Sequence, residues 1–393
     1  MPIEINDLIS FTQRMIHAKS PTAGEKDVVA VMSTEMNRLG FDRVWVDEFG
    51  SLLGTVEGAQ PGPTLLLDGH CDTVEANAAD WKHDPWGGAI ENDRLYGRGT
   101  ADMKGSLAAM IHAVGLIERS SLRGRLVVSA TISEENAEGC AMKSVIENIH
   151  PEYVVIGEAT CLNLNRGGRG RAELHVTTFG RSAHSSSPQA GRCAVTDMMR
   201  VIQAIDSQPI TVDPVLGPGS IVLTDIISKP HPGHSVIPYR CHVTYDRRLL
   251  TGESREGLLD GLKSLPGLDD IEYMVDLAPL EEYTYTGELL QGEKFFPAWL
   301  FSEKHPLVES ALSGLQSIGL NPIVGAYRFC TNAAYCAGVA GIPTIGFGIG
   351  REEDAHTVDE SIAVNDLLTA AHGYQGIIHS VCKKLTKYAG LRS

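Results

Sequence analysis

Acidic and imidazole side chains follow short apolar runs at several places in this chain. The apolar runs at 64–67, 126–132 and 153–156 lead into the sequences DGHCD, SEE and GE, and the run at 342–348 is followed by DAH. The sequence GRGTAD precedes a helical stretch. In open α/β sheets, ligands bind in the crevice beyond the carboxyl ends of the strands. These segments carry the residues that could bind metal ions or move protons there: His70, Asp72, Asp102, Glu134, Glu135, Glu158 and His356.

Such a group of side chains predicts a site for two divalent cations. Several carboxylates that converge with two imidazoles would repel one another strongly, whereas two divalent ions balance their charge. Singly, each residue has a plainer interpretation, since a histidine after a strand is often an ordinary hydrogen-bonded side chain and an acidic pair often lies in solvent. The prediction therefore depends on the coincidence of five segments. A phosphate loop at 97–105 is rejected because Lys104 precedes Gly105, whereas that motif needs Gly-Lys-Ser/Thr.

The composition narrows the class of protein. The 393 residues include 33 Lys+Arg and 49 Asp+Glu, which gives a formal net charge of −16. This balance disfavours a nucleic-acid partner, which needs a positive surface, and docking on anionic lipid. No apolar run approaches the roughly 20 residues of a membrane helix, and no secretory signal is visible at the start. The 8 cysteines are scattered without a CxxC pair, which indicates a reducing compartment. We expect a cytoplasmic enzyme of two or three domains.

The apolar pattern predicts an α/β fold. Helical spacing of apolar residues indicates helices, whereas the four apolar runs are too short for helices and too uniformly apolar for half-exposed strands. They are typical of central strands covered on both faces, so we expect a mixed, mostly parallel sheet flanked by helices. The predicted helices are 4–17, 24–39, 106–118, 140–149 and 305–318.

The pattern changes near residue 172. The segments 172–180 and 241–248 alternate apolar and polar residues, helical runs at 192–206 and 253–264 follow them, and further strands are expected at 219–227 and 271–276. This β-α-β-β-α-β order is that of a ferredoxin-like unit. We expect one α/β metal-binding domain made of residues 1–171 and 293–393, interrupted by an α+β lid or dimerisation domain at 172–292.

The motifs resemble the binuclear zinc amidohydrolase and peptidase family M20, which contains acetylornithine deacetylase, succinyl-diaminopimelate desuccinylase, aminoacylase and glutamate carboxypeptidase. The stretch LYGRGTADMKGSLAAMI at 95–111 is similar to the desuccinylase branch. The stretches FFPAW at 295–299, CTN at 330–332 and GIPTIGFG at 341–348 are closer to a branch of selenium-metabolism-associated hydrolases. The resemblance spans the whole chain, and all five metal-bearing motifs occur in the family's order.

The resemblance implies a role for each residue. His70 and Glu158 would bind one metal ion, Glu135 and His356 the other, and Asp102 would bridge the two. Asp72 would hold the His70 ring through its second nitrogen, and Glu134 would be the general base. The ions would be Zn²⁺, with Co²⁺ or Mn²⁺ as alternatives. The family also implies a homodimer through the inserted domain, in which a histidine, here His184, reaches the partner's site to stabilise the oxyanion.

The resemblance further implies a substrate with a carboxylate beside the scissile amide, such as an N-acyl amino acid or a dipeptide. Arg248, in the Asp-x-Arg strand after Ile237-Pro238, and Arg328 are both candidates to bind that carboxylate, and either could equally be a surface arginine. Asn332 in the CTN turn is a third candidate. Two departures from the desuccinylase pattern, the sequence FCTNA at 329–333 and Ser235 in place of an asparagine, weaken a strict diaminopimelate assignment.

The alternatives to a metal-dependent hydrolase are a non-catalytic binding protein and a thiol hydrolase. A non-catalytic binding protein on the same scaffold predicts loss of the base or of a ligand, and these residues are all present. A thiol hydrolase would use Cys71 or Cys330 with a nearby histidine, but a buried thiol is the better interpretation of Cys71.

Overall fold

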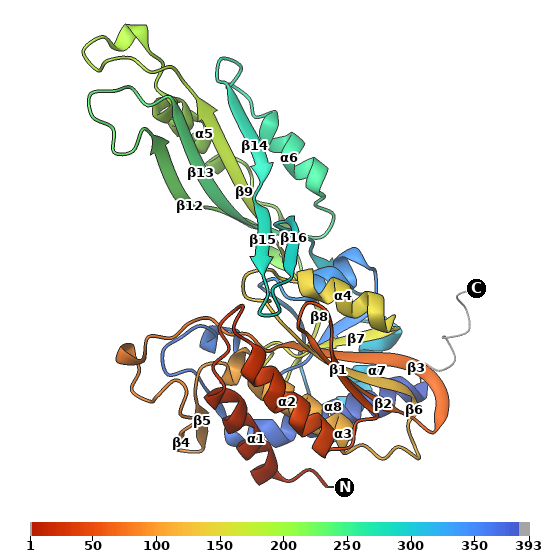
Figure 1. The fold of residues 1–393 in the computed structure, drawn as a ribbon. Helices are drawn as coiled ribbons and strands as arrows, with labels where there is room; N and C mark the ends of the chain where they lie inside the picture. The colour runs from red at the N-terminus through yellow and green to blue at the C-terminus, as the bar shows by residue number, and fades with distance from the viewer. Residues whose placement is uncertain (1, 385–393) are drawn as a thin grey trace.

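The structure is a computed structural model that describes residues 2–384, and its largest sheet has parallel strands at its centre (Figure 1). The strand order is β1-β2-β6-β3-β7-β20-β8-β18, with β19 beside β8. The neighbours β6, β3, β7 and β20 are parallel, while β1, β2, β8 and β18 introduce antiparallel pairs. The bounds are β1 Arg43–Val46, β2 Leu52–Glu57, β3 Gln60–His70, β6 Arg123–Thr131, β7 Tyr153–Ile156, β8 Leu164–Gly168, β18 Trp299–Leu300, β19 Val324–Tyr327 and β20 Thr344–Gly346. The predicted mixed, mostly parallel sheet is confirmed.

Helices cover both faces of this sheet, which explains why its strands are uniformly apolar. On β3, Leu65 and Leu67 are buried in a core shared with α1, α2, α3, α7 and α8, whereas Leu66 faces the core formed with α4. The helices lie close to the predicted ranges, and α8 adds a long helix near the C-terminus. Their bounds are α1 Ile5–His17, α2 Lys26–Arg38, α3 Gly105–Gly115, α4 Cys140–Ile149, α7 Pro306–Ser317 and α8 Val364–Lys384.

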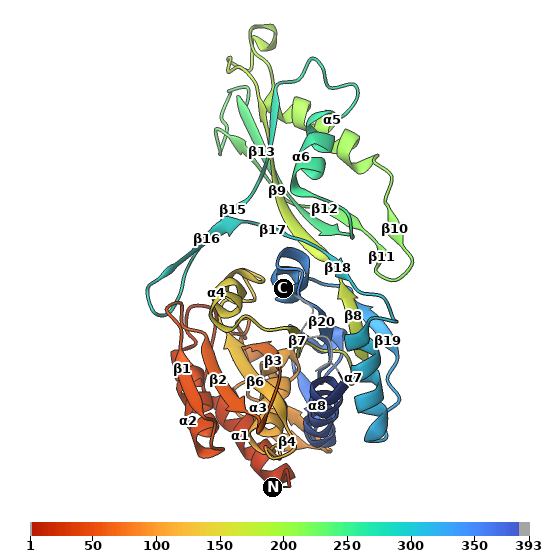
Figure 2. The same cartoon turned by 90° about the vertical axis from the view of Figure 1, so that its right-hand side faces the viewer.

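A second sheet, here called the lid sheet, stands apart from the first, as Figure 2 shows. Its strand order is β12-β13-β9-β14, all pairs are antiparallel, and β17 extends the pairing of β9. The chain order β9-α5-β12-β13-α6-β14 is the expected ferredoxin-like order, and the lid sheet has its own apolar core with α5 and α6. The bounds are β9 Gly170–Phe179, α5 Ala194–Asp206, β12 Ser220–Lys229, β13 Arg240–Leu249, α6 Arg255–Lys263, β14 Tyr273–Leu277 and β17 Phe295–Phe296. The domain boundaries at 171–172 and 292–293 stay a prediction.

A hairpin not foreseen from the sequence links the two parts of the fold. It consists of β15 (Pro279–Tyr283) and β16 (Leu289–Glu293), and we call residues 279–293 the strap. At its tip, the Tyr285 hydroxyl donates to the carbonyl of Gly50 at 2.9 Å, and Thr286 Oγ1 donates to the carbonyl of Glu48 at 3.0 Å. Gly50 has φ +115°, and a Cβ there would lie 2.5 Å from the Tyr285 ring, so only glycine permits this contact. The strap therefore ties the lid sheet to the turn between β1 and β2 (Figure 1).

Small elements complete the fold. β21 (Ser361–Ala363), β5 (Arg94–Tyr96) and β4 (Ile90–Glu91) form a three-stranded sheet, and β10 (Val212–Asp213) pairs with β11 (Gly217–Pro218). Short helical turns are η1 Ala78–Asp80, η2 Thr100–Lys104, η3 Pro188–Ala190, η4 Ala334–Val339 and η5 Glu352–Asp354. Among residues 2–384, no helix combines the length and the apolar character that crossing a bilayer requires.

Candidate metal centre

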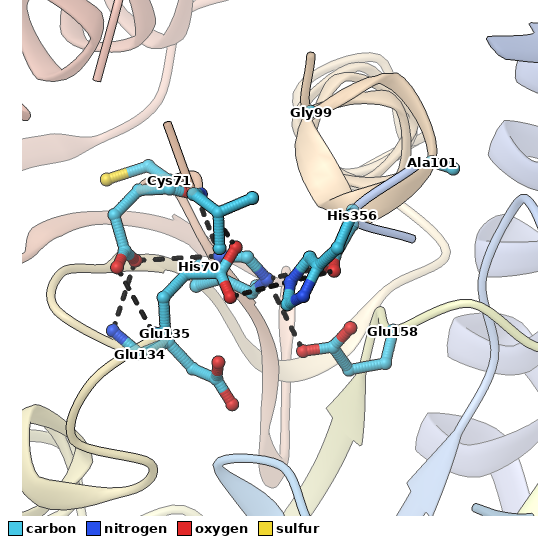
Figure 3. A network of polar contacts seen from close by, with 12 residues as sticks. His70, Cys71, Gly99, Ala101, Glu134, Glu135, Glu158 and His356 are labelled. Atoms are coloured by element: carbon cyan, nitrogen blue, oxygen red, sulfur yellow. Dashed lines mark hydrogen bonds and ion pairs between the residues drawn. The ribbon is translucent and has the colours of Figure 1, made fainter. Parts of the chain in front are cut away.

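Three neighbouring parallel strands bring the predicted ligands to one edge of the large sheet. β3 ends at His70, β6 ends just before Glu134 and Glu135, and β7 ends just before Glu158. Because these strands are parallel, their carboxyl ends meet at the same edge. Asp102 arrives from η2, at the start of α3, and His356 from the loop after η5. Figure 3 shows His70, Glu135, Glu158 and His356 turned toward one another.

The two imidazoles share the carboxylate of Asp102. His70 Nε2 lies 2.8 Å from Asp102 Oδ1, and His356 Nε2 lies 3.2 Å from Asp102 Oδ2. Each imidazole also has its own carboxylate: His70 Nε2 lies 3.5 Å from Glu158 Oε1, and His356 Nε2 lies 2.8 Å from Glu135 Oε2. Asp102 thus stands between two half-sites, each of one imidazole and one further carboxylate.

Burial and mutual repulsion shift the pKa values of these groups. Burial raises the pKa of Glu158 to about 8, and it raises the pKa of Glu134 well above its ordinary value. Hydrogen bonds to Asp102 and Glu135 raise the pKa of His356 to about 10. For Asp102, burial alone would raise the pKa, but hydrogen bonds from His356 and His70 outweigh it and hold the pKa below its usual range. The cluster therefore needs positive charge close to its carboxylates, which protons or metal ions can supply.

The donor set fits divalent transition metals. Ligand atoms of His70, Glu134 and Glu158 lie within 4.8 Å of one another, and so do those of His70, Asp102 and Glu135. A mixed set of imidazole nitrogens and carboxylate oxygens suits zinc, cobalt or manganese. Glu134 belongs to the first group, and its side chain is largely buried beside the candidate ligands.

Asp72 organises the centre in a way that differs in part from the prediction. His70 Nδ1 lies 3.0 Å from the main-chain carbonyl of Asp72 but 3.5 Å from its carboxylate, so the carbonyl is the nearer partner of the ring. The carboxylate instead accepts from the backbone N–H groups of Glu134 at 3.1 Å and Glu135 at 3.2 Å, and from the Thr22 hydroxyl at 2.9 Å. One residue thus orients the first imidazole and the acidic pair together.

Glu360 is a buried carboxylate that the sequence reasoning missed. Its Oε1 accepts from the backbone N–H groups of Ala101 at 2.7 Å and Asp102 at 3.0 Å, and its Oε2 accepts from Gly99 N–H at 3.0 Å and Arg98 Nη1 at 2.7 Å. These four bonds fix the backbone that carries Asp102. The only signal in the sequence is an acidic residue directly before an apolar strand, which is too common to be informative.

The candidate carboxylate-binding arginines lie in the region where the lid sheet meets the large sheet. Arg248, on β13, pairs with Asp246 at 2.9 Å, and the exposed Arg328 follows β19. A third arginine, Arg169, was missed. Burial lowers the pKa of Arg169, and the positive charges of Arg328 and Arg248 lower it further. The carboxylate of Glu352 acts on Arg169 in the opposite direction and raises its pKa.

Asn332 has partners other than the predicted substrate. The side chain is buried, and its amide donates to Asp68 Oδ2 at 3.0 Å and to Thr131 Oγ1 at 2.8 Å. Its carbonyl oxygen accepts from Gly139 N–H at 2.9 Å. Both amide N–H groups and the carbonyl oxygen of Asn332 thus bond within the fold, so the arrangement favours a scaffold role that joins β3, β6 and the start of α4.

His184 lies outside the cluster of its own chain. It is exposed in the loop between β9 and α5, and its Nδ1 lies 2.7 Å from Ser186 Oγ. This loop is at the end of the lid sheet farthest from the large sheet (Figure 1). A role for His184 in catalysis therefore requires a second subunit.

The two candidate nucleophilic cysteines are poorly suited to that role. Cys71 and Cys330 are buried, and burial raises the pKa of each thiol well above its ordinary value. Since the thiolate is the nucleophile, a raised pKa argues against a thiol hydrolase.

Residues 66–380 match the profile of Peptidase family M20/M25/M40. The chain belongs to this family. It is therefore a member of a family of hydrolases that act on amide bonds with the help of metal ions, as the motifs predicted.

Individual members of the family resemble the chain over most of its length. The uncharacterised protein YgeY of Escherichia coli (strain K12) is 33% identical over 380 residues, which cover 94% of this chain and 93% of that protein. Acetylornithine deacetylase of Aliivibrio salmonicida is 31% identical over 79% of this chain and 78% of its own length. The M20 member YXEP of Bacillus subtilis, described as a dinuclear metal binding peptidase, has the same fold, with a TM-score of 0.73 at 11% identity over 96% of this chain and 98% of that one.

Proposed function

We propose that the chain is a two-metal hydrolase that cleaves an amide bond next to a carboxylate, as an N-acyl amino acid deacylase of the acetylornithine deacetylase or desuccinylase type. The observation that carries the proposal is the carboxylate of Asp102 shared between two imidazoles, each with a further carboxylate, beside the buried Glu134. An alternative in the same family is a dipeptidase or carboxypeptidase, which the peptidase description of YXEP supports.

Five residues would hold the metal ions. His70 and Glu158 would bind one ion, His356 and Glu135 the other, and Asp102 both. Bound divalent ions supply a more acidic water and polarise the substrate carbonyl. Zn²⁺ is the proposed metal, with Co²⁺ and Mn²⁺ as alternatives that the same donors accept. A non-catalytic homologue is disfavoured because both imidazoles, the shared carboxylate and the candidate base are retained.

Glu134 would move the proton in this reaction. Its backbone N–H donates to Asp72, and its neighbour Glu135 contacts His356, so the backbone that carries the Glu134 side chain is held beside the candidate ligands. Burial raises its pKa well above the ordinary value, which brings the carboxylate nearer to the basicity that accepting a proton from water at neutral pH requires. Glu134 would then return that proton to the leaving amine.

The arginines would select the substrate. Arg248 and Arg328 remain the proposed partners of the substrate carboxylate, and Arg169 joins them because it lies close enough to both for their positive charges to lower its pKa. A substrate carboxylate beside these guanidinium groups would accept charge-assisted hydrogen bonds from them.

A homodimer through the lid sheet would complete the site with His184. In the described part of the chain, β12 is one of the two terminal strands of the lid sheet, and it exposes Val222 by 53% and Ile226 by 51%. An exposed apolar edge strand favours pairing with a second chain. The proposed dimer would bring His184 of one subunit toward the centre of the other.

The substrate proposal is tested with a panel assayed after loading with Zn²⁺, Co²⁺ or Mn²⁺: N-acetyl amino acids, N-succinyl amino acids and dipeptides, each beside its carboxamide analogue. We expect turnover of free-carboxylate substrates, loss of at least about tenfold in kcat/KM with the carboxamides, and loss of activity on chelation that added metal restores. Iodoacetamide should have a much smaller effect than EDTA. Hydrolysis that persists in EDTA but stops on alkylation would contradict the proposal.

A further inference from the structure

Two histidines lie together on the lid sheet, on a different sheet from the metal centre. His175 on β9 and His242 on β13 have ring centroids 4.7 Å apart, with their planes at 74°. Their strand neighbours Leu174, Val176 and Val243 are buried in the core with α5 and α6. Because side chains alternate along a strand, both imidazoles lie on the opposite, helix-free face of the lid sheet.

The strand register brings a carboxylate to the same place. His175 is directly opposite Thr244 on β13 and Asp276 on β14, while His242 is opposite Thr177 on β9. Directly opposed residues have Cβ atoms about 4.5–5.5 Å apart on one face of the sheet. The exposed Asp276 can therefore reach an ion bound at His175 by a change of its side-chain rotamer.

Hydrogen bonding leaves the imidazoles able to bind an ion. His242 Nδ1 lies 3.0 Å from Thr177 Oγ1, and when Nδ1–H donates to that hydroxyl, Nε2 keeps its lone pair for a metal. His175 Nε2 lies 4.0 Å from Glu173 Oε1, whose carboxylate already pairs with Lys294 at 3.1 Å. His175 thus has no tight ion pair that a metal would have to displace.

Burial and the surrounding charges favour the neutral form of His242. Burial lowers the pKa of His242, and the nearby His175 and Arg240 lower it further, so His242 holds the neutral form that binds metals. Asp276 and Asp225 flank the pair on the outer strands, while Arg240 lies two residues before His242 on β13 and is opposite Lys229 on β12.

We propose that His175 and His242, completed by Asp276, form a third metal site, which binds one divalent transition-metal ion such as Zn²⁺, Ni²⁺ or Cu²⁺. The two imidazoles exclude Mg²⁺ and Ca²⁺, which prefer oxygen ligands. An ion bound here connects β13, β9 and β14, so it stabilises the lid sheet against local opening.

The test uses Cu²⁺ as a paramagnetic probe on the holoenzyme already loaded with zinc. We expect one equivalent of Cu²⁺ per chain with an EPR signal that reports two imidazole nitrogens, without release of zinc. Each of His175→Asn and His242→Asn should weaken Cu²⁺ binding by at least about tenfold and remove one nitrogen from the signal, while Asp276→Asn should weaken it several-fold. The matched control is His234→Asn, an exposed histidine in a loop of the same part of the chain, which should change neither quantity.

A second measurement localises the effect within the fold. Hydrogen exchange of the β9, β13 and β14 amides should slow when Cu²⁺ is added to the wild type but not to His175→Asn. Unchanged copper affinity and spectrum in the two histidine variants would overturn the proposal. Copper binding that releases an equal amount of zinc would also overturn it, because the ion would then occupy the centre at the large sheet.

Discussion

At the scale of single residues, the centre depends on where each carboxylate oxygen points. Asp102 divides its two oxygens between His70 and His356, while Asp72 uses both of its oxygens to hold the backbone of Glu134 and Glu135. The adjacent side chains of Glu134 and Glu135 therefore have different surroundings and different proposed roles. Glu135 contacts an imidazole directly, whereas Glu134 stands beside the cluster and is the proposed base.

Glu134→Gln tests the proposed role of Glu134 as the general base, because the amide keeps the shape of the side chain but cannot accept the proton. We expect two metal ions per chain to be retained and kcat to fall by roughly 10²–10⁴-fold. Metal content by elemental analysis and steady-state kinetics measure the two effects. The matched control is Glu147→Gln, an exposed position on α4. Loss of a metal ion would instead make Glu134 a ligand, and wild-type turnover would remove it from the mechanism.

At the scale of elements, the position of Asp102 depends on a carboxylate from a distant segment. Glu360 lies immediately before β21 and accepts three backbone N–H bonds from the segment 99–102 at the start of α3, together with one from Arg98. Neither the bend at η2 nor β21 alone would define where the Asp102 side chain points. Their connection through Glu360 does so.

Glu360→Gln should therefore weaken metal binding, although Glu360 is not a proposed ligand, because it positions the backbone of Asp102. The substitution removes the charge that pairs with the buried Arg98, so we expect a loss of roughly 3–5 kcal/mol in the free energy of unfolding. Metal affinity should fall about 10–100-fold, as with other residues that orient ligands. Thermal unfolding and equilibrium dialysis against buffered zinc measure these losses. Glu353→Gln, an exposed change on η5, is the control, and an unaltered zinc affinity in Glu360→Gln would contradict the positioning role.

The clustering of the candidate ligands could be anticipated from the sequence because His70, Glu135, Glu158 and His356 follow apolar runs, a signal contained within a few residues. Glu360 and Arg169 could not be predicted in this way. Glu360 contacts Asp102 across 258 positions of sequence, and the repulsion that marks Arg169 exists only once β13 and β19 are folded beside it. For Asn332, the CTN motif drew attention to the residue but could not reveal its partners. Those partners lie on β3, on β6 and at the start of α4, which meet only in the folded chain.

At the scale of the whole molecule, a single chain holds the candidate metal ligands and His184 at separate places. The cluster lies at the edge of the large sheet, whereas His184 lies in the loop after the far end of β9 (Figure 1). The exposed apolar edge of β12 offers the means to join two chains. The proposed catalytic unit is therefore a dimer.

Mixing two inactive variants tests this arrangement. Glu134→Gln lacks the base and His184→Ala lacks the oxyanion donor, so each homodimer should have little activity. In a heterodimer, the His184→Ala chain keeps Glu134 and receives His184 from the other subunit. After subunit exchange of an equal mixture, roughly a quarter of the wild-type kcat should return. Light scattering and kinetics follow the mixture. Failure to recover activity in a verified heterodimer, or a wild-type protein that is monomeric and fully active, would contradict the arrangement.

The strap has a mechanical consequence for any such assembly. The chain crosses between the lid sheet and the large sheet at the β8–β9 junction and again between β17 and β18, and Tyr285 and Thr286 add a third anchorage on the turn before β2. With the two adjacent crossings alone, the lid sheet could rotate about them relative to the large sheet. The third attachment lies away from these crossings and restrains that rotation. Reorientation must either bend the hairpin or detach its tip. Leu280 and Leu290 of the strap are buried in the core of the large sheet, and Tyr285 packs against that core. Detaching the strap therefore costs more than its two tip hydrogen bonds, which contribute about 0.5–1.5 kcal/mol each, so the strap restrains the orientation of the lid sheet.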